Sequence, residues 1–235
     1  MTVFDDIDSL SQAAASAFVS AASEAIAARG RFVVTLSGGS TPKRMLGLLA
    51  NDPFRDEVDW TRVFALFGDE RYVPPDDPQS NEKMARETLL DHVPIPPKQV
   101  FGMYRPGGPE GAAAAYEGAV RGLLGSSGEL DLVYLGLGPD GHTASLFPGD
   151  PSVHEQTRWV VAGTASANAR ERVTMTPPLL TKARSVLFLI AGADKAEPLQ
   201  RLLNGPLDLD QTPSQAVGRF AAHVEYFVDR LAWPG

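Results

Sequence analysis

The chain has 235 residues, of which 43% are hydrophobic, and 21 Lys and Arg residues against 29 Asp and Glu residues give it a formal net charge of -8. This size and hydrophobic content suit one domain with a large core, and the acidic balance argues against a general nucleic-acid-binding surface, which would normally show a basic patch. The absence of cysteine excludes disulfides, thiol catalysis and thiolate metal sites, and it is compatible with the cytoplasmic location that we expect.

The N-terminal region predicts an amphipathic helix and no signal peptide. It is rich in alanine and lacks the basic start and continuous apolar core of a signal peptide, and no apolar run in the chain is long enough to span a membrane. Apolar residues recur at three- and four-residue steps from Ile7 to Ala25, in a stripe that ends at Arg29 and Gly30. The small alanines of this helix suggest close approach to a sheet.

A strand and a glycine turn follow. Residues 31–36 (RFVVTL) predict the strand, and a helix is expected over 43–50. The residues between them that could bind an anion are Gly38, Gly39, Ser40 and Thr41. Glycines let backbone N–H groups approach an anion, the hydroxyls add donors, and the positive end of the helix dipole points the same way. The turn therefore predicts a phosphate-binding loop, although an ordinary glycine turn has the same composition. It lacks the Gly-Lys-Ser/Thr of a nucleotide P-loop, which disfavours ATP or GTP hydrolysis.

Charged residues follow the second predicted strand, over 63–67. Asp69, Glu70 and Arg71 lie between the end of that strand and a long proline-rich loop, and Asn81 is expected near the start of the next helix. A solvated ion-pair cluster is the common alternative for such residues. Their place at a strand end beside a long loop nevertheless favours a functional role.

The chain is organised around the segment 130–148, LDLVYLGLGPDGHTASLFP. Apart from Asp131, its first six residues form an apolar run typical of a strand buried on both faces of a parallel sheet. A glycine turn then brings His142, Thr143 and Ser145 out where the strand end meets solvent, the place where open α/β sheets bind ligands. Asp140, two residues before His142, is a candidate orienter or electrostatic partner for a histidine base.

The glycines of this turn also match G-x-G-x-x-G, at Gly136, Gly138 and Gly141. A dinucleotide site would need a long helix straight after the turn and an acidic residue at the end of the next strand. Neither is evident, and Pro139 and Pro148 disfavour the helix. His142 could instead simply satisfy backbone groups in a loop.

The rest of the chain predicts further helices and strands. Helices are predicted over 82–90, 111–124 and 195–203, and strands over 100–104, 159–162, 173–176, 185–191 and 223–228. The most continuous apolar run, 185–191, predicts a central strand, and 223–228 predicts one at or near a sheet edge. Arg172 and Lys195 could each present a cation to an anion near a strand or helix end.

The other three histidines, His92, His154 and His223, are expected to be structural or solvated. No spacing typical of metal ligands occurs, so a dedicated transition-metal site is not expected.

Four segments in this order carry a family resemblance: SGGSTP at 37–42, GDER at 68–71 with SN at 80–81, GLGPDGHTASLFP at 136–148, and RVTMTPPLL at 172–180 followed by GADKA at 192–196. Together they resemble the 6-phosphogluconolactonase family. The resemblance implies one α/β domain over 1–235 with an open, mostly parallel, Rossmann-like sheet and helices on both faces. It also implies hydrolysis of 6-phospho-D-glucono-1,5-lactone to 6-phosphogluconate without metal or organic cofactor, by a protein that we expect to be a monomer.

The resemblance and the chemistry of an ester carbonyl assign the candidate residues. His142 is expected to activate water, with Asp69 or Asp140 orienting it or stabilising its cation. Arg71 could bind the phosphate or lie near the lactone carbonyl. We favour the carbonyl, with Asp69 available to hold the guanidinium. The expected substrate- and phosphate-binding residues are Gly38, Gly39, Ser40, Thr41, Asn81, Arg172 and Lys195.

Two other functions remain open. The related glucosamine-6-phosphate deaminases share the glycine turn and the Asp-Gly-His element, but their pattern resembles D-E-Y and G-H-I-A-F-N-E-P, and its glutamate has no counterpart in this chain. A noncatalytic sugar-phosphate sensor is the second alternative, since the same fold serves as the effector domain of some transcription regulators. The retained His142 and the missing DNA-binding segment count against it.

Overall fold

A computed structural model describes residues 1–165 and 170–233. A seven-stranded parallel sheet with the strand order β1-β10-β9-β6-β2-β3-β5 forms its centre. These strands are β1 (Thr2–Phe4), β2 (Phe32–Leu36), β3 (Val63–Phe67), β5 (Val100–Phe101), β6 (Leu132–Leu135), β9 (Val186–Ile190) and β10 (Val224–Asp229). All residues of β2, β6 and β9 are buried, which confirms them as strands covered on both faces.

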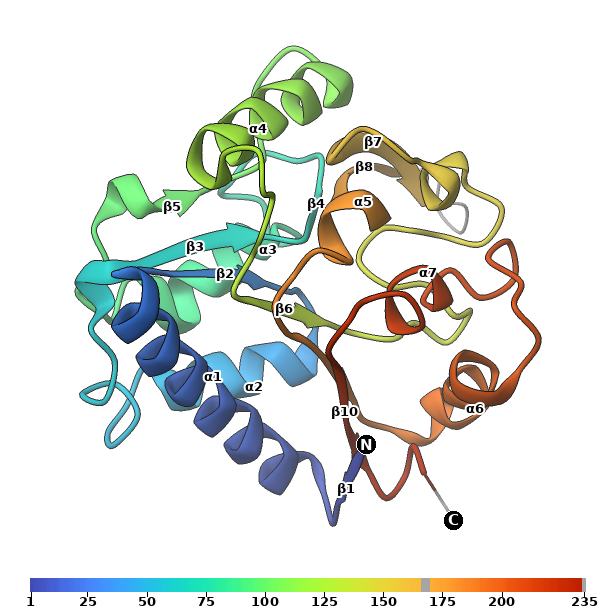
Figure 1. The fold of residues 1–235 in the computed structure, drawn as a ribbon, viewed down its shortest axis with the longest axis horizontal. Helices are drawn as coiled ribbons and strands as arrows, with labels where there is room; N and C mark the ends of the chain where they lie inside the picture. Colours follow the sequence, from blue (N-terminus) through green and yellow to red (C-terminus); the bar gives the residue numbers. More distant parts are fainter. Residues whose placement is uncertain (166–169, 234–235) are drawn as a thin grey trace.

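Helices lie on both sides of this sheet. Figure 1 shows α1 and α2 below strands β2 and β3, and α4 above them. The helices are α1 (Ile7–Arg29), α2 (Ser40–Leu49), α3 (Asn81–Ala85), α4 (Pro109–Leu124), α5 (Pro177–Leu180), α6 (Ala196–Asn204) and α7 (Gln215–Gly218). A π-helical turn, Arg86–Leu90, continues α3. The predicted α/β class with a mostly parallel sheet is confirmed.

The alanines of α1 let it approach the sheet closely, as expected. Asp6 caps its first turn by accepting a hydrogen bond from the Ser9 backbone N–H, and Gly30 ends it with a φ of 75°. Ala14 is fully buried, and its carbonyl accepts a hydrogen bond of 2.8 Å from the hydroxyl of Tyr134 on β6. A larger side chain at that position would push the helix away from the sheet.

A second, smaller sheet is antiparallel and has the order β4-β8-β7. Its strands are β4 (Asp69–Arg71), β8 (Arg170–Met175) and β7 (Val160–Ala165). The sequence predicted the last two strands but neither β4 nor the separate sheet. β4 could not be predicted because it forms by pairing with β8. Asp69 pairs there with Thr174, which is more than a hundred residues away in the chain, and no local sequence pattern encodes such a pairing.

The edges of the large sheet were the least predictable part. β10 lies next to the edge, as expected, but the edge strand itself is β1, three mostly exposed residues without a strand pattern. At the other edge, β5 has two residues where five were predicted.

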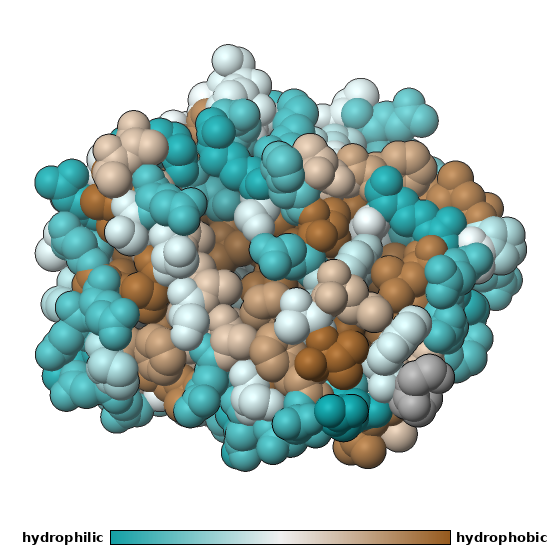
Figure 2. All heavy atoms as spheres, turned by 60° about the horizontal axis from the view of Figure 1, so that its bottom comes forward, coloured by the Kyte–Doolittle hydropathy of each residue, from teal (hydrophilic) through white to brown (hydrophobic). Residues whose placement is uncertain are grey.

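The outer surface is mixed in polarity. On the face shown in Figure 2, hydrophobic residues gather toward the middle and hydrophilic ones surround them. Within residues 1–165 and 170–233, no helix is both long and apolar enough to cross a membrane.

Candidate active site

A cavity of about 260 Å³ lies at the carboxyl ends of β2, β3, β6 and β9. Parallel strands end at one edge of a sheet, so loops far apart in the chain meet there. The residues that line it are Ser37, Gly38, Gly39, Ser40, Thr41, Pro42, Asp69, Arg71, Asn81, Gly136, Leu137, Gly138, Pro139, His142, Ala144, Leu189, Ala191 and Lys195. Most of the predicted site residues are therefore brought together.

The predicted phosphate-binding loop forms one wall. Helix α2 begins at Ser40, three residues earlier than predicted, so Ser40 and Thr41 belong to its first turn. In the described part of the chain no side chain caps this helix start, which leaves its first backbone N–H groups for water or a ligand. Gly39 has a φ of 104°, a conformation that favours glycine.

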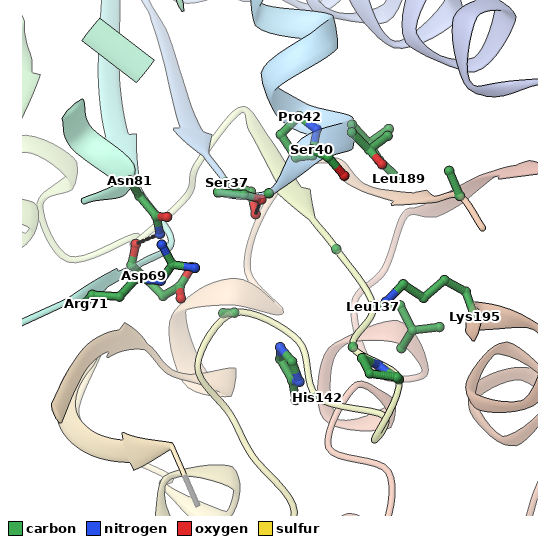
Figure 3. A pocket seen from close by; sticks show the side chains of 18 residues that line it. Ser37, Ser40, Pro42, Asp69, Arg71, Asn81, Leu137, His142, Leu189 and Lys195 are labelled. Carbon is green, nitrogen blue, oxygen red and sulfur yellow. Dashed lines mark hydrogen bonds between the residues drawn. The ribbon is translucent and has the colours of Figure 1, made fainter. Parts of the chain in front are cut away.

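Gly38 is required for a different reason. A Cβ atom there would lie 2.0 Å from Oδ1 of Asn81, another residue of the cavity wall. Nδ2 of Asn81 in turn donates a 2.9 Å hydrogen bond to the backbone carbonyl of Asp69 (Figure 3). The loop after β2 thus packs directly on the segment after β3.

His142 and Asp140 form a close pair. Nδ1 of His142 lies 2.5 Å from Oδ1 of Asp140, and the His142 backbone N–H donates to the same oxygen at 3.1 Å. An ionised carboxylate can only accept, so Nδ1 carries the hydrogen and Nε2 remains an acceptor. Gly138 makes room for the pair, because a Cβ atom there would lie 2.0 Å from Nδ1.

The ionisation of Asp140 reflects two opposing effects. Burial raises the pKa of its carboxyl, but the hydrogen bond and the charge of His142 lower it by more, so the pKa lies below its ordinary value. Asp140 is thereby kept as the anion that His142 requires. Of the two carboxylates left open by the sequence, Asp140 is the one in contact with His142.

Asp69 and Arg71 project from the same face of β4. Oδ2 of Asp69 accepts a 2.6 Å hydrogen bond from the hydroxyl of Ser145, and Nη1 of Arg71 donates to the backbone carbonyl of Gln79 at 2.5 Å. Among the described residues no ion pair joins Asp69 to Arg71, so the expectation that Asp69 would hold the guanidinium is wrong. The reason is that the Ser145 hydroxyl, which sequence reasoning could not place, is the partner of that carboxylate.

Glu70 points the other way and has a structural role. Its carboxylate accepts hydrogen bonds from the backbone N–H groups of Arg71, Asn81 and Glu82 and from the hydroxyl of Ser80. Burial raises the pKa of Glu70, against the lowering effect of these four hydrogen bonds. Glu70 therefore holds the start of α3, and with it Asn81, against β4.

Of Arg172 and Lys195, the two cations predicted to bind the phosphate, only Lys195 lines the cavity. Its Nζ atom lies 2.8 Å from Oδ2 of Asp194, which is exposed. Arg172 is not among the lining residues. It pairs with Arg71 across β8 and β4, and its Nε and Nη1 atoms are buried with no hydrogen-bond partner among the described residues. Burial, followed by the charge of Arg71, lowers the pKa of Arg172. Its assignment to the phosphate stays a prediction.

The close-up in Figure 3 gives the arrangement of these groups. Asp69 and Arg71 approach from one side of the cavity and Lys195 from the opposite side, with Ser40 above and His142 below. Thr143 and Ser145, expected to face solvent, are instead 1% exposed. Thr143 donates to the Gly136 carbonyl, so of the three side chains expected to face solvent only that of His142 is partly exposed.

The sequence model of the family described as glucosamine-6-phosphate isomerases/6-phosphogluconolactonase matches residues 5–226. The chain belongs to this family. A 6-phosphogluconolactonase of Mycobacterium tuberculosis is 38% identical over 227 residues, 92% of this chain and 91% of that protein. One of Streptomyces coelicolor is 36% identical over 230 residues, 93% and 88% of the two chains.

Solved structures of the family share the fold. The 6-phosphogluconolactonase from Trypanosoma brucei superimposes with a TM-score of 0.86 at 29% identity, covering 98% of this chain and 96% of that one. A monomeric glucosamine-6-phosphate deaminase gives a TM-score of 0.84 at 25% identity, covering 99% and 98%. Because both activities occur on this fold, the residues of the cavity must separate them.

Proposed function

We propose that this protein hydrolyses 6-phospho-D-glucono-1,5-lactone to 6-phospho-D-gluconate, the second step of the oxidative pentose phosphate pathway. The observation that carries the proposal is His142, paired with Asp140, in the wall of a cavity that is also lined by a helix start, Lys195 and Arg71. A lactone carbonyl needs an activated water, stabilisation of charge on its oxygen, and a proton for the departing ring oxygen. The cavity offers a group for each need, and the names of the relatives support the same reaction.

In this proposal His142 is both base and acid. With Nδ1 donating to Asp140, Nε2 takes a proton from water as the water oxygen attacks the carbonyl carbon. When the bond from that carbon to the ring oxygen breaks, Nε2 returns the proton to the ring oxygen, which becomes a hydroxyl. Asp140 stabilises the imidazolium that exists between these steps and keeps the ring in the required tautomer.

The phosphate would lie at the start of α2. Donors come from the free N–H groups of its first turn, from the glycines before it and from the hydroxyls of Ser40 and Thr41. Lys195, directly before α6, supplies a positive charge. Arg172, which pairs with Arg71 on the neighbouring strand, would add positive electrostatic potential without lining the cavity. A site of this kind concentrates cations locally in a chain whose net charge is -8.

Arg71 would then lie at the carbonyl end. It approaches from the side of the cavity opposite to Lys195, so one small phosphate is not expected to contact both (Figure 3). Negative charge develops on the carbonyl oxygen only in the transition state, and a fixed guanidinium nearby lowers that barrier. Asp69, beside it, and Asn81 would bind the hydroxyl groups of the lactone.

Hydrolysis as written uses only water and side chains, so the proposal includes no cofactor. The proposal includes a monomeric protein, the state that we expect from the sequence. The lack of cysteine supports a location in the reducing cytoplasm.

Phe147 argues against the deaminase alternative. It stands where the deaminase-like pattern has glutamate, and its ring centroid lies 4.6 Å from that of His142. An aromatic ring at this point can pack on the imidazole but cannot exchange a proton.

Two assays with the same pure protein test the proposal. Freshly prepared 6-phosphogluconolactone should release acid well above its spontaneous rate, and glucosamine 6-phosphate should release no ammonia. Absence of lactone hydrolysis, or release of ammonia at a comparable rate, would contradict it.

A further inference from the structure

Ser145 joins the turn that carries His142 to the small antiparallel sheet. The turn is closed by a 2.9 Å hydrogen bond from the Leu146 backbone N–H to the Thr143 carbonyl, and Ala144 within it has a φ of 49°. This is a costly conformation for a residue with a Cβ atom, and it persists only where the surroundings enforce it. Ser145, next in the chain, is 1% exposed and is held at two points.

The two points are a backbone and a side-chain contact. The Ser145 N–H donates to the hydroxyl oxygen of Thr174 at 3.2 Å, and the Ser145 hydroxyl donates to Oδ2 of Asp69 at 2.6 Å. Asp69 and Thr174 are directly paired on β4 and β8, so both contacts reach the same patch of the small sheet. The first contact anchors the turn. The second acts on a carboxylate of the cavity wall.

The hydroxyl of Ser145 is what orients that carboxylate. Over residues 1–165 and 170–233 it is the only hydrogen-bond donor to the Asp69 side chain, because Arg71 donates to Gln79 instead. A short hydrogen bond to an ionised acceptor is strong and directional. With Oδ2 occupied in this way, Oδ1 is left for a ligand in the cavity.

We propose that Ser145 is a positioning residue, whose hydroxyl fixes the Asp69 carboxylate in the orientation that meets the reacting end of the substrate. This inference rests on the proposed lactone hydrolysis. It also gives the small sheet a function. β4 and the His142 turn come from different parts of the chain, and the Ser145 hydroxyl sets the position of the Asp69 carboxylate relative to the His142 turn.

A double-mutant cycle tests the proposal. Ser145→Ala should lower kcat about tenfold, the scale of one lost hydrogen bond to a charged group, and change KM by less than about twofold. In an Asp69→Ala background the same substitution should change kcat by less than about twofold, because no carboxylate is left to orient. An equal loss in both backgrounds, or a Ser145→Ala enzyme with wild-type kcat, would overturn the proposal.

Thr174→Val is the matched control for loosening of the turn. It removes the acceptor of the Ser145 N–H and keeps the hydroxyl contact to Asp69. We expect a lower melting temperature and a smaller loss of kcat than in Ser145→Ala. If Thr174→Val reproduced the whole kinetic effect, Ser145 would act through the shape of the turn and the proposal would be wrong.

A structural measurement separates this inference from the proposed function. Crystal structures of the wild type and of Ser145→Ala should show the Asp69 carboxylate rotated or in two conformers in the variant, and an unchanged carboxylate overturns the inference whatever the activity. A wild-type protein that does not hydrolyse the lactone disproves the proposed function alone. Should Ser145→Ala fail to fold, Ser145→Cys, which keeps the volume with a weak donor, replaces it in both experiments.

Discussion

The two ends of the cavity are built on different principles. The end with the α2 start and Lys195 presents backbone N–H groups and an ammonium group, which suit an anion that stays unchanged during the reaction. The end with His142 and Arg71 holds its groups by short hydrogen bonds to Asp140 and to the Gln79 carbonyl. Groups of the first kind bind ground state and transition state alike, whereas groups of the second kind act on charges that appear only during the reaction. Substitutions at the α2 end should therefore mainly raise KM, whereas substitutions at the His142 end should mainly lower kcat.

His142→Ala should have the largest effect. Loss of the acid-base group should lower the catalysed rate by about two to four decades, measured with spontaneous hydrolysis subtracted. His154→Ala is a matched control, because His154 also contacts an aspartate, Asp210 at 2.8 Å, but lies outside the cavity. It should keep the wild-type rate. Near wild-type turnover by His142→Ala would remove His142 from the mechanism.

Arg71→Met should come next, with kcat lowered by roughly one to three decades and a smaller change in the affinity for 6-phosphogluconate. Arg71→Lys keeps the charge without the planar fork and should be intermediate. Calorimetry with the product decides between the two roles. If the affinity for the product fell by as much as kcat/KM while kcat was retained, Arg71 would be a phosphate ligand. The proposed division of the cavity into a phosphate end and a reacting end would then be wrong.

Lys195→Ala tests the phosphate end and should mainly raise KM, about tenfold, with kcat nearly unchanged. The preference for the phosphorylated lactone over gluconolactone should shrink by a similar factor. Lys182→Ala, which removes the same charge outside the cavity, controls for the change in net charge. Lys195 does not belong to the site if its variant discriminates between the two lactones as strongly as the wild type.

The smallest expected effect concerns stability. Because the folded protein holds the pKa of Asp140 below its ordinary value, ionised Asp140 contributes stability above the pKa of the unfolded chain, and this is lost as the pH falls through the folded value. The difference in melting temperature between wild type and Asp140→Asn should therefore be largest near neutral pH and shrink in acid. A difference that stays constant or grows as the pH falls would contradict the lowered pKa.

The sequence by itself determined the strands and turns that are specified by residues close together in the chain. Apolar runs predicted β2, β3, β6 and β9, since a strand buried on both faces needs little polar alternation. Glycine turns at their ends placed the cavity at the carboxyl edge of the sheet. His142 and Asp140, two residues apart, form their pair within a single turn, so composition and spacing were sufficient to propose it.

Only the tertiary structure decided the contacts between distant segments. The exclusion of Arg172 from the cavity wall, the orientation of Glu70 toward α3, and the hydrogen bond from Ser145 to Asp69 all depend on how β4 pairs with β8. Strand alternation sends Asp69 and Glu70 to opposite faces once β4 forms, and β4 forms only because a partner lies beside it. Such pairing is a property of the folded chain, because its energy comes from neighbours that are remote in sequence.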